Sequence, residues 1–290
     1  MKNFLFALCG IALVCLFSFC SAEDPELDET ANDLQSEDRI LPGYTPDEEE
    51  DHSLLDEEDE VQAETTAVLP PLYKDPDAPV LQINELRTEY LSSQSRAEFI
   101  EFRANADIDL AGMRVLIASN NLNPVVYEFL PVEIKEYEYV VLHLRTLSDE
   151  CKDEYGEKKD ESGGRDSSPV SRDFWVPGNK ELLRKTDIIY VLDKDDNVID
   201  AVMISEKPDA QWSKNYFTET AEFLFNEGAW KSSDGTIPSP AEAVSTLSIG
   251  SALTRSISRD ETAAFTRTAS DWYITATGAM SPGTRNNPRN

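Results

Sequence analysis

The side chains best suited to chemistry by type and spacing lie in the run DKDDN at positions 193–197. Asp193, Asp195 and Asn197 stand at alternate positions, which are the first three ligand positions of an EF-hand-like calcium loop. Such a loop would also need glycine and glutamate at two later positions, where the chain has Val198 and Ile204. A β-hairpin turn explains the same residues without a metal, because Asp and Asn favour tight turns. We favour the hairpin interpretation.

Signatures of catalysis are missing from the sequence. The two histidines are His52, in a strongly acidic stretch, and His143, in a predicted strand, and no group of His and Cys has the spacing of a zinc site. Neither a phosphate-binding glycine loop nor a G-x-S-x-G nucleophile elbow occurs. Because carboxylates are abundant throughout, no pair of them stands out for acid–base work. We therefore expect no catalysis and no cofactor.

The N-terminus predicts export. Lys2 precedes an uncharged, mostly apolar run over residues 4–19, and a run of about 16 residues is shorter than the roughly 20 that span a bilayer. The small residues that follow, ending at Ala22, fit a cleavage site, so residues 1–22 are predicted to be a signal peptide. An uncleaved N-terminal anchor is the alternative. No later apolar run reaches membrane-spanning length, so we expect a periplasmic, cell-surface or secreted protein without a transmembrane helix.

The cysteines leave a second possibility for the N-terminus. Cys20 is a candidate for lipidation because Leu16 lies four residues before it, as in a bacterial lipobox, whereas the bulky Phe19 favours cleavage after Ala22. Two further cysteines lie inside the signal peptide. If Cys20 also leaves, Cys151 is the only thiol of the mature chain and no intramolecular disulfide can form.

Most of the negative charge lies in a leader over residues 23–78. This leader contains 21 acidic residues and two basic ones, in a chain whose net charge is −30. The leader has too little apolar surface to offset the entropy lost on ordering, and it is therefore predicted to be disordered. Its proline-rich end is predicted to be stiff. The negative charge of the leader argues against nucleic acid as a partner, because phosphate groups are bound by Lys and Arg. We favour the interpretation that the leader is a solvating tether that holds the domain away from a surface. Weak calcium capture and docking to a basic partner are the alternatives.

From residue 79 to residue 290 the pattern becomes that of one β-rich domain. Short β-branched and aromatic runs separated by turn residues predict an all-β, immunoglobulin-like two-sheet sandwich. The segments that read as strands are 80–86, 98–102, 113–117, 125–130, 139–144, 188–192, 198–204, 253–258 and 272–275. Two segments interrupt them. Residues 147–172 are charged and predict a long exposed loop, and residues from about 209 to 250 predict a helical insertion, with a second short helix over 240–247.

The order of short motifs in this domain resembles that of the lamin tail domain, as found in exported bacterial proteins. The matching elements are Ile83-Asn84-Glu85, Glu98-Phe99-Ile100-Glu101-Phe102, Asp109-Leu110-Ala111-Gly112-Met113, the run 193–200 ending at Asp200, Ser256-Ile257-Ser258-Arg259, Asp271-Trp272, and Ser281-Pro282-Gly283-Thr284-Arg285-Asn286. Phe99 replaces the tryptophan of the family pattern. The loop around Cys151 and the 209–250 insertion lengthen the domain beyond the usual family size.

The resemblance implies a sandwich whose motif residues serve packing. Gly112 and Gly283 suit turns with positive φ, and Trp272 supplies a large apolar body to the core. We also expect Glu98, Glu101 and Arg259 to form a charge cluster near one sheet edge, with a structural role.

Export, the acidic tether, the motif order and the missing catalytic signatures together favour a binding or scaffolding module at the cell envelope. Its partner would be an unknown protein or glycan. Two alternatives stay open. Lamin-tail-like domains often accompany nuclease or phosphoesterase domains, which suggests a hydrolase-associated or weakly hydrolytic protein, and a cohesive structural surface component is the other possibility.

Overall fold

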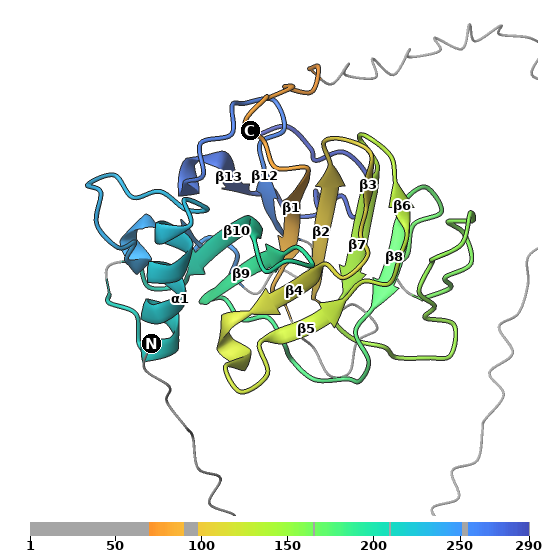
Figure 1. Ribbon diagram of the computed structural model, residues 1–290, viewed down its shortest axis with the longest axis horizontal. Helices are drawn as coiled ribbons and strands as arrows, with labels where there is room; N and C mark the ends of the chain where they lie inside the picture. Colours follow the sequence, from red (N-terminus) through yellow and green to blue (C-terminus); the bar gives the residue numbers. More distant parts are fainter. Residues whose placement is uncertain (1–69, 90–97, 165, 209, 251–254, 290) are drawn as a thin grey trace, which may run out of the picture. The chain divides into compact units, whose positions relative to one another are not determined.

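The computed structural model describes residues 70–89, 98–164, 166–208, 210–250 and 255–289, and these form two β-sheets with one α-helix beside them (Figure 1). The predicted all-β sandwich with a helical insertion is confirmed. The predicted signal peptide, the lipidation candidate Cys20, and the leader up to residue 69 lie outside the described residues.

The first sheet has six strands in the order β13-β12-β1-β2-β7-β8. Their bounds are β1 Leu81–Arg87, β2 Phe99–Ala104, β7 Tyr139–His143, β8 Arg172–Trp175, β12 Ile257–Arg259 and β13 Trp272–Ile274. Neighbours are antiparallel except β7 and β8, which run parallel. The sequence pattern did not predict β8, which begins at the last residue of the charged 147–172 segment and is only four residues long.

The second sheet has five strands in the order β11-β10-β9-β4-β5. The bounds are β4 Arg114–Ile117, β5 Val125–Glu128, β9 Asp187–Leu192, β10 Val198–Ser205 and β11 Val244–Ser245, and a small ribbon pairs β3 Ile108–Asp109 with β6 Glu133–Ile134. Strand β5 pairs with β4 alone and forms one edge of this sheet.

The apolar core lies between the two sheets because side chains alternate along each strand. On β2, Ile100 and Phe102 face the core, while Glu101 between them faces the outer side. On β1 the register shifts between Ile83 and Glu85, so that Ile83 and Leu86 both face the core although they are three positions apart. This irregularity places Glu85 opposite Glu101 on the outer side of the sheet.

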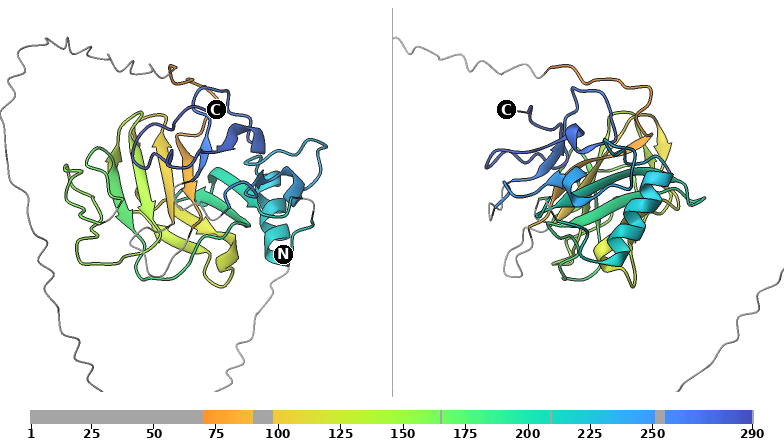
Figure 2. Two further views of the ribbon diagram at one scale, coloured as in Figure 1. Left: turned by 180° about the vertical axis from the view of Figure 1, so that it is seen from behind. Right: turned by 90° about the vertical axis from the view of Figure 1, so that its left-hand side faces the viewer.

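Helix α1, Asn215–Asn226, covers one side of the second sheet near β9 and β10 (Figure 2). Phe217, Ala221 and Leu224 are its buried residues, and their spacing by three and four places them on one face. Gly228, with φ of 69°, follows its end. The second predicted helix is a 3-10 helix, η2 Pro240–Glu242, followed by β11; the other 3-10 helices are η1 Ala118–Asn120 and η3 Ala269–Asp271.

The segment 147–172 is a long loop up to Ser171, as its charge pattern predicted, and more than half of its described residues are exposed. It is not exposed throughout, because Glu154 and Ser171 are buried. The Glu154 carboxylate accepts hydrogen bonds from the backbone N–H of Asp173, Glu161 and Ser162 at 2.9–3.0 Å. These bonds fasten the loop to strand β8, because a buried carboxylate must find donors when it leaves water.

The end of the proline-rich stretch also contacts the domain. The backbone N–H of Tyr73 donates to the carbonyl of Glu261 at 2.8 Å, and a carboxylate oxygen of Asp75 accepts from the N–H of Phe265 at 2.8 Å. The linker that was expected to separate leader and domain is therefore attached to the domain from Tyr73 onward. Among the described residues, no helix is long and apolar enough to cross a membrane.

Candidate functional site

Two carboxylates lie side by side on the outer side of the first sheet. Glu85 of β1 and Glu101 of β2 are directly opposite each other, and neither is exposed to solvent. Glu85 accepts hydrogen bonds from the hydroxyl groups of Ser256 and Ser258, and Glu101 accepts one from the amide of Asn84 at 2.8 Å. Burial, and next the negative charge of Glu85, raise the pKa of Glu101 well above its usual value.

The C-terminal segment 281–286 covers these carboxylates and donates backbone N–H groups to them. Ser281 N–H bonds to Glu85 at 3.1 Å, and Gly283 N–H bonds to Glu101 at 2.6 Å; Pro282 lies between these two donors. Farther along, the Asn286 N–H bonds to Glu261 at 2.8 Å. The side-chain amide of Asn286 also donates to the carbonyl groups of Asn84 and Arg259 at 3.1 and 2.9 Å.

Gly283 has a conformation and a position that only glycine fits. Its φ is 79°, and a Cβ atom there would lie 2.3 Å from the Ser171 hydroxyl and 2.6 Å from Ser168 Cβ. The predicted turn glycine Gly112 also has a positive φ, 70°, and its N–H donates to the Phe129 carbonyl at 2.9 Å. Both positions agree with the role that the motif pattern predicted for them.

Arg259 forms the centre of a second buried charge group. Its guanidinium lies 2.8 Å from the Asp200 carboxylate and 3.3 Å from that of Asp271, and its Nε donates to the Ile83 carbonyl. The ring of Trp272 lies 4.3 Å from the guanidinium carbon, which adds a cation–π contact. Burial raises the pKa of Asp200 although the neighbouring guanidinium opposes the shift.

The predicted cluster of Glu98, Glu101 and Arg259 does not form. Glu101 pairs with Asn84 and Gly283, Arg259 pairs with Asp200 and Asp271, and Glu98 accepts hydrogen bonds from the backbone N–H of Leu182 and Leu183. The interpretation was wrong because acidic and basic residues of one motif set were assumed to pair with one another. In the fold each finds a different donor or acceptor.

The candidate calcium residues form the tight turn of the β9–β10 hairpin. The Asp193 carboxylate accepts hydrogen bonds from the backbone N–H of Asp195 and of Asn197, and from the Asn197 side-chain amide, at 2.8–2.9 Å. Asp196 adopts a φ of 67°, which Asp tolerates in turns. Among the described residues, no group of three His, Cys, Asp or Glu side chains is arranged to hold a metal ion.

His143 and Cys151 take no part in an open site. His143 is buried on β7, where its Nε2 lies 2.8 Å from Asp173 and its ring stacks on Trp175 with centroids 3.8 Å apart. Cys151 is a free, half-buried thiol whose sulfur lies 3.7 Å from the Ser148 hydroxyl.

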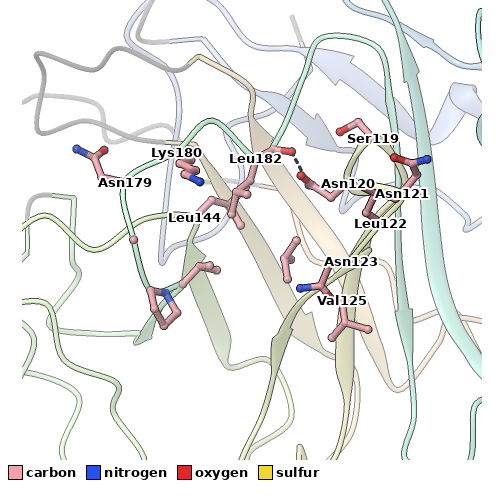
Figure 3. A pocket seen from close by; sticks show the side chains of 14 residues that line it. Ser119, Asn120, Asn121, Leu122, Asn123, Val125, Leu144, Asn179, Lys180 and Leu182 are labelled. Atoms are coloured by element: carbon pink, nitrogen blue, oxygen red, sulfur yellow. Dashed lines mark hydrogen bonds between the residues drawn. The ribbon is translucent and has the colours of Figure 1, made fainter. Parts of the chain in front are cut away.

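A groove of about 630 Å³ opens beside the start of β5 and the turn that precedes it (Figure 3). We call it the amide groove. Apolar side chains of β5 and of the segments around β7 and β8 line it together with a set of polar ones. The polar lining residues are Ser119, Asn120, Asn121, Asn123, Asn179 and Lys180, and the apolar ones are Leu122, Val125, Val126, Leu144, Val176, Pro177 and Leu182.

Buried carboxylates hold both walls of the amide groove. Asp187 accepts from the backbone N–H and the hydroxyl of Ser119, at 3.0 and 2.5 Å, which fixes the 3-10 turn between β4 and β5. Glu98 fixes the opposite wall through its bond to Leu182, and the Asn120 amide joins the walls by donating to the Leu182 carbonyl at 3.1 Å. Burial raises the pKa of Asp187 to about 6. The motif residue Glu98 therefore supports this groove.

The rim of the groove offers polar groups that the protein leaves unused. The side-chain amides of Asn121 and Asn123 make no hydrogen bond within the described part of the chain, and Leu122 between them is 97% exposed. Lys180 is the single charged residue of the lining. Primary amides both donate and accept hydrogen bonds, so this rim suits an uncharged polar ligand such as a peptide backbone.

The fold places the protein in the class of all-β sandwiches with a helical insertion. Comparison with models of protein families then identifies its family. A family model described as "protein second domain" matches residues 79–274, which is more than half of the chain. The protein belongs to this family. No curated protein matches the chain. The match begins where the sequence pattern placed the start of the β-rich domain.

Proposed function

We propose that this protein is a non-catalytic binding or scaffolding module at the cell envelope, and that the amide groove holds an extended segment of a protein partner. The observation that carries the proposal is the groove itself, with an apolar floor, unused amides on its rim and Leu122 almost fully exposed. Leu122 adjoins the apolar lining of the groove, so a partner seated there would remove its side chain and that lining from water together.

The edge strand β5 supports a peptide over a glycan as the ligand. Val125 and Val126 belong to β5 and also line the groove, so the backbone of an edge strand lies next to the apolar floor. An extended peptide can add to such an edge by main-chain hydrogen bonds while its side chains enter the adjacent pocket.

The envelope location rests on the N-terminal sequence pattern, that is, on residues 1–22 and on Cys20 as a possible lipid anchor. Mass spectrometry of the native mature protein tests it. An N-terminus at Glu23 is the expected result, a lipidated Cys20 would indicate lipid anchoring, and an intact Met1 would contradict cleavage and leave the uncleaved anchor as the alternative.

Kinship with the lamin tail domain is a further part of the proposal. It is supported by the gathering of Asn84, Glu85, Glu101, Gly283 and Asn286, which come from the first and last motifs, in one hydrogen-bonded cluster.

Site-specific photo-crosslinking tests the binding function. A photoreactive amino acid in place of Leu122 is expected to crosslink the full-length protein to a discrete partner in its native cells. The same amino acid in place of Val170, which is 63% exposed on a different loop, is the matched control. Identical crosslinks from both positions, or none from position 122, would contradict the proposal.

A further inference from the structure

A second groove, of about 350 Å³, lies between the start of α1 and the segment that leads into β9. Four cations line it: Arg184, Lys185, Lys207 and Lys214. The aromatic rings of Trp212 and Tyr216 lie among them, and we call this site the basic groove. Among the described residues that line it, Glu206 is the one acidic residue.

The charge of this groove is opposite to that of the domain around it. Residues 79–290 contain 35 acidic and 23 basic side chains. An acidic ligand is therefore repelled by most of the surface, and a local group of four cations gives it one place where the electrostatic potential is favourable. Complementary charge determines which partner binds, and at which place, more than it determines the affinity.

Three of the four cations are available for a ligand. Arg184, Lys207 and Lys214 are exposed, and their side chains make no ion pair within the part of the chain that the structure describes. Lys185 differs, because its ammonium group lies 3.1 Å from Glu89 and donates to the Gly250 carbonyl at 2.6 Å.

The aromatic residues give the groove an apolar wall with a fixed shape. The indole N–H of Trp212 donates to the Pro238 carbonyl at 2.8 Å, and its ring packs on Phe217 with centroids 5.6 Å apart. Tyr216 also packs on Phe217, with centroids 4.6 Å apart. Rings held in this way bury area against a partner at low entropic cost, which is why aromatic residues are enriched in protein interfaces.

We propose that the basic groove binds an acidic, extended polypeptide segment of a protein partner. Three of its cations are lysines, which act as flexible point charges and can follow carboxylates spaced along an extended chain. Cations on the rim and aromatic rings within suit a segment in which carboxylates alternate with apolar side chains. This site is separate from the amide groove, although both grooves are lined by residues of the segment 180–187.

A titration of the full-length protein tests the proposal. The probe is an eight-residue synthetic peptide with six acidic residues and two leucines, and the neutral control peptide has glutamine and asparagine in place of the acids. Calorimetry at low salt is expected to detect the acidic peptide only. The affinity is expected to fall several-fold when the ionic strength is raised to about 0.2 M, because the charges are exposed.

Two pairs of lysines provide matched variants. The double charge reversal K207E/K214E is expected to weaken binding about tenfold, and the neutral pair K207Q/K214Q to weaken it less. The control K152E/K158E makes the same change of net charge at two exposed lysines of the 147–172 loop and is expected to change binding less than about twofold. Trp212→Phe should abolish most of the change in tryptophan fluorescence on binding and should also weaken the calorimetric affinity, because it alters the apolar wall of the groove.

Three results would overturn the inference. One is wild-type affinity in K207E/K214E, and another is an equal loss in K152E/K158E, which would mean that only the net charge matters. The third is displacement of the peptide by inorganic phosphate at constant ionic strength, which would identify a site for a compact anion. None of these results bears on the amide groove, whose crosslinking test uses a different residue.

Discussion

Two polar regions of this domain differ in how they use their hydrogen-bonding groups. In the cluster around Glu85 and Glu101, side-chain oxygens accept from serine, asparagine and backbone donors, and the carboxylates are closed off from solvent. At the rim of the amide groove, Asn121 and Asn123 have no partner in the described chain and Leu122 is almost fully exposed. A satisfied, buried group stabilises the fold, whereas an unsatisfied, exposed one is available to a ligand.

The contrast shows that the motif residues of this chain mainly build the fold. Most of the side chains that the motif order singled out lie in the buried clusters, and the two grooves are lined almost wholly by other residues. Substitutions should therefore separate the two regions. Those in the clusters should cost stability, and those at the groove rims should cost binding.

The largest loss is expected from Asp200→Ala. It leaves the buried Arg259 guanidinium with a weaker set of partners and removes the acceptor of the Ile83 N–H. Breaking one side of a buried ion pair typically costs about 3–5 kcal/mol of unfolding free energy. Urea unfolding followed by circular dichroism measures it. A loss below about 1 kcal/mol would show that the cluster contributes little.

Gly283→Ala should destabilise the domain by about 3 kcal/mol. The added Cβ meets Ser171 and Ser168, and the positive φ adds strain. Gly235→Ala is the control, since its φ of 74° is similar but nothing lies within 4 Å of the new Cβ. The control should lose only about 1–2 kcal/mol. Equal losses in both variants would mean that the contact with the C-terminal segment is unimportant.

The pH dependence of stability tests Asp187, which supports the groove from inside. Burial raises the pKa of Asp187 to about 6 in the folded protein, above its ordinary value of 3.8, so the folded state binds the proton more tightly. This contribution is full below about pH 4, is lost as the pH rises to about 6, and amounts to about 3 kcal/mol. Glu85, Glu98, Glu101 and Asp200, whose pKa values are also raised, change stability in the same direction.

Asp187→Asn isolates this part of the profile. Unfolding free energies measured from pH 4 to pH 7 should fall less steeply in the variant than in the wild-type protein. Parallel profiles for the two proteins would exclude Asp187 as a titrating group in this range.

The β9–β10 hairpin should show a smaller effect. Asp193→Ala removes the acceptor of three hydrogen bonds in an exposed turn and is expected to cost about 1 kcal/mol. Because those bonds already occupy the carboxylate, millimolar calcium should leave the melting temperature of the wild-type protein unchanged. A clear rise in Tm with calcium would restore the metal interpretation of this loop.

Leu122→Asp should have the smallest effect on stability, within about 0.5 kcal/mol, because the side chain is 97% exposed. Its effect on binding should be large, since it places a charge at the mouth of the apolar groove. Comparing the partner recovered by the wild-type and variant proteins measures this, and equal recovery would remove Leu122 from the binding surface.

Much of the fold could be predicted because it depends on local patterns. Alternating apolar residues identified most of the strands, and Asp and Asn residues identified the 193–197 turn. The buried part of the 147–172 loop could not be predicted, because its charged residues are ordered by single long-range bonds such as that from Asp173 to Glu154. A run of charges looks the same in a sequence whether its carboxylates face water or backbone donors.

The grooves could not be predicted for a related reason. Asn121 and Lys180 of the amide groove, or Arg184 and Lys214 of the basic groove, are separated in sequence and belong to no motif. Their proximity arises only in the folded domain, where the turn before β5 meets the segment after β8 and where the start of α1 meets the segment before β9. The one available signal was the run of asparagines around Leu122, which places an apolar residue in a turn where no core contact is expected.

The fastening of residues 281–286 to β1 and β2 has a consequence for how the sheet surface is held. Ser281, Gly283 and Asn286 bond to partners 196, 182 and 202 positions earlier, so these contacts join two segments that lie far apart in the sequence of the domain. Removing residues 281–286 would take the backbone N–H groups of Ser281 and Gly283 away from Glu85 and Glu101. The enclosure of the two carboxylates therefore depends on contacts made across almost the whole length of the domain.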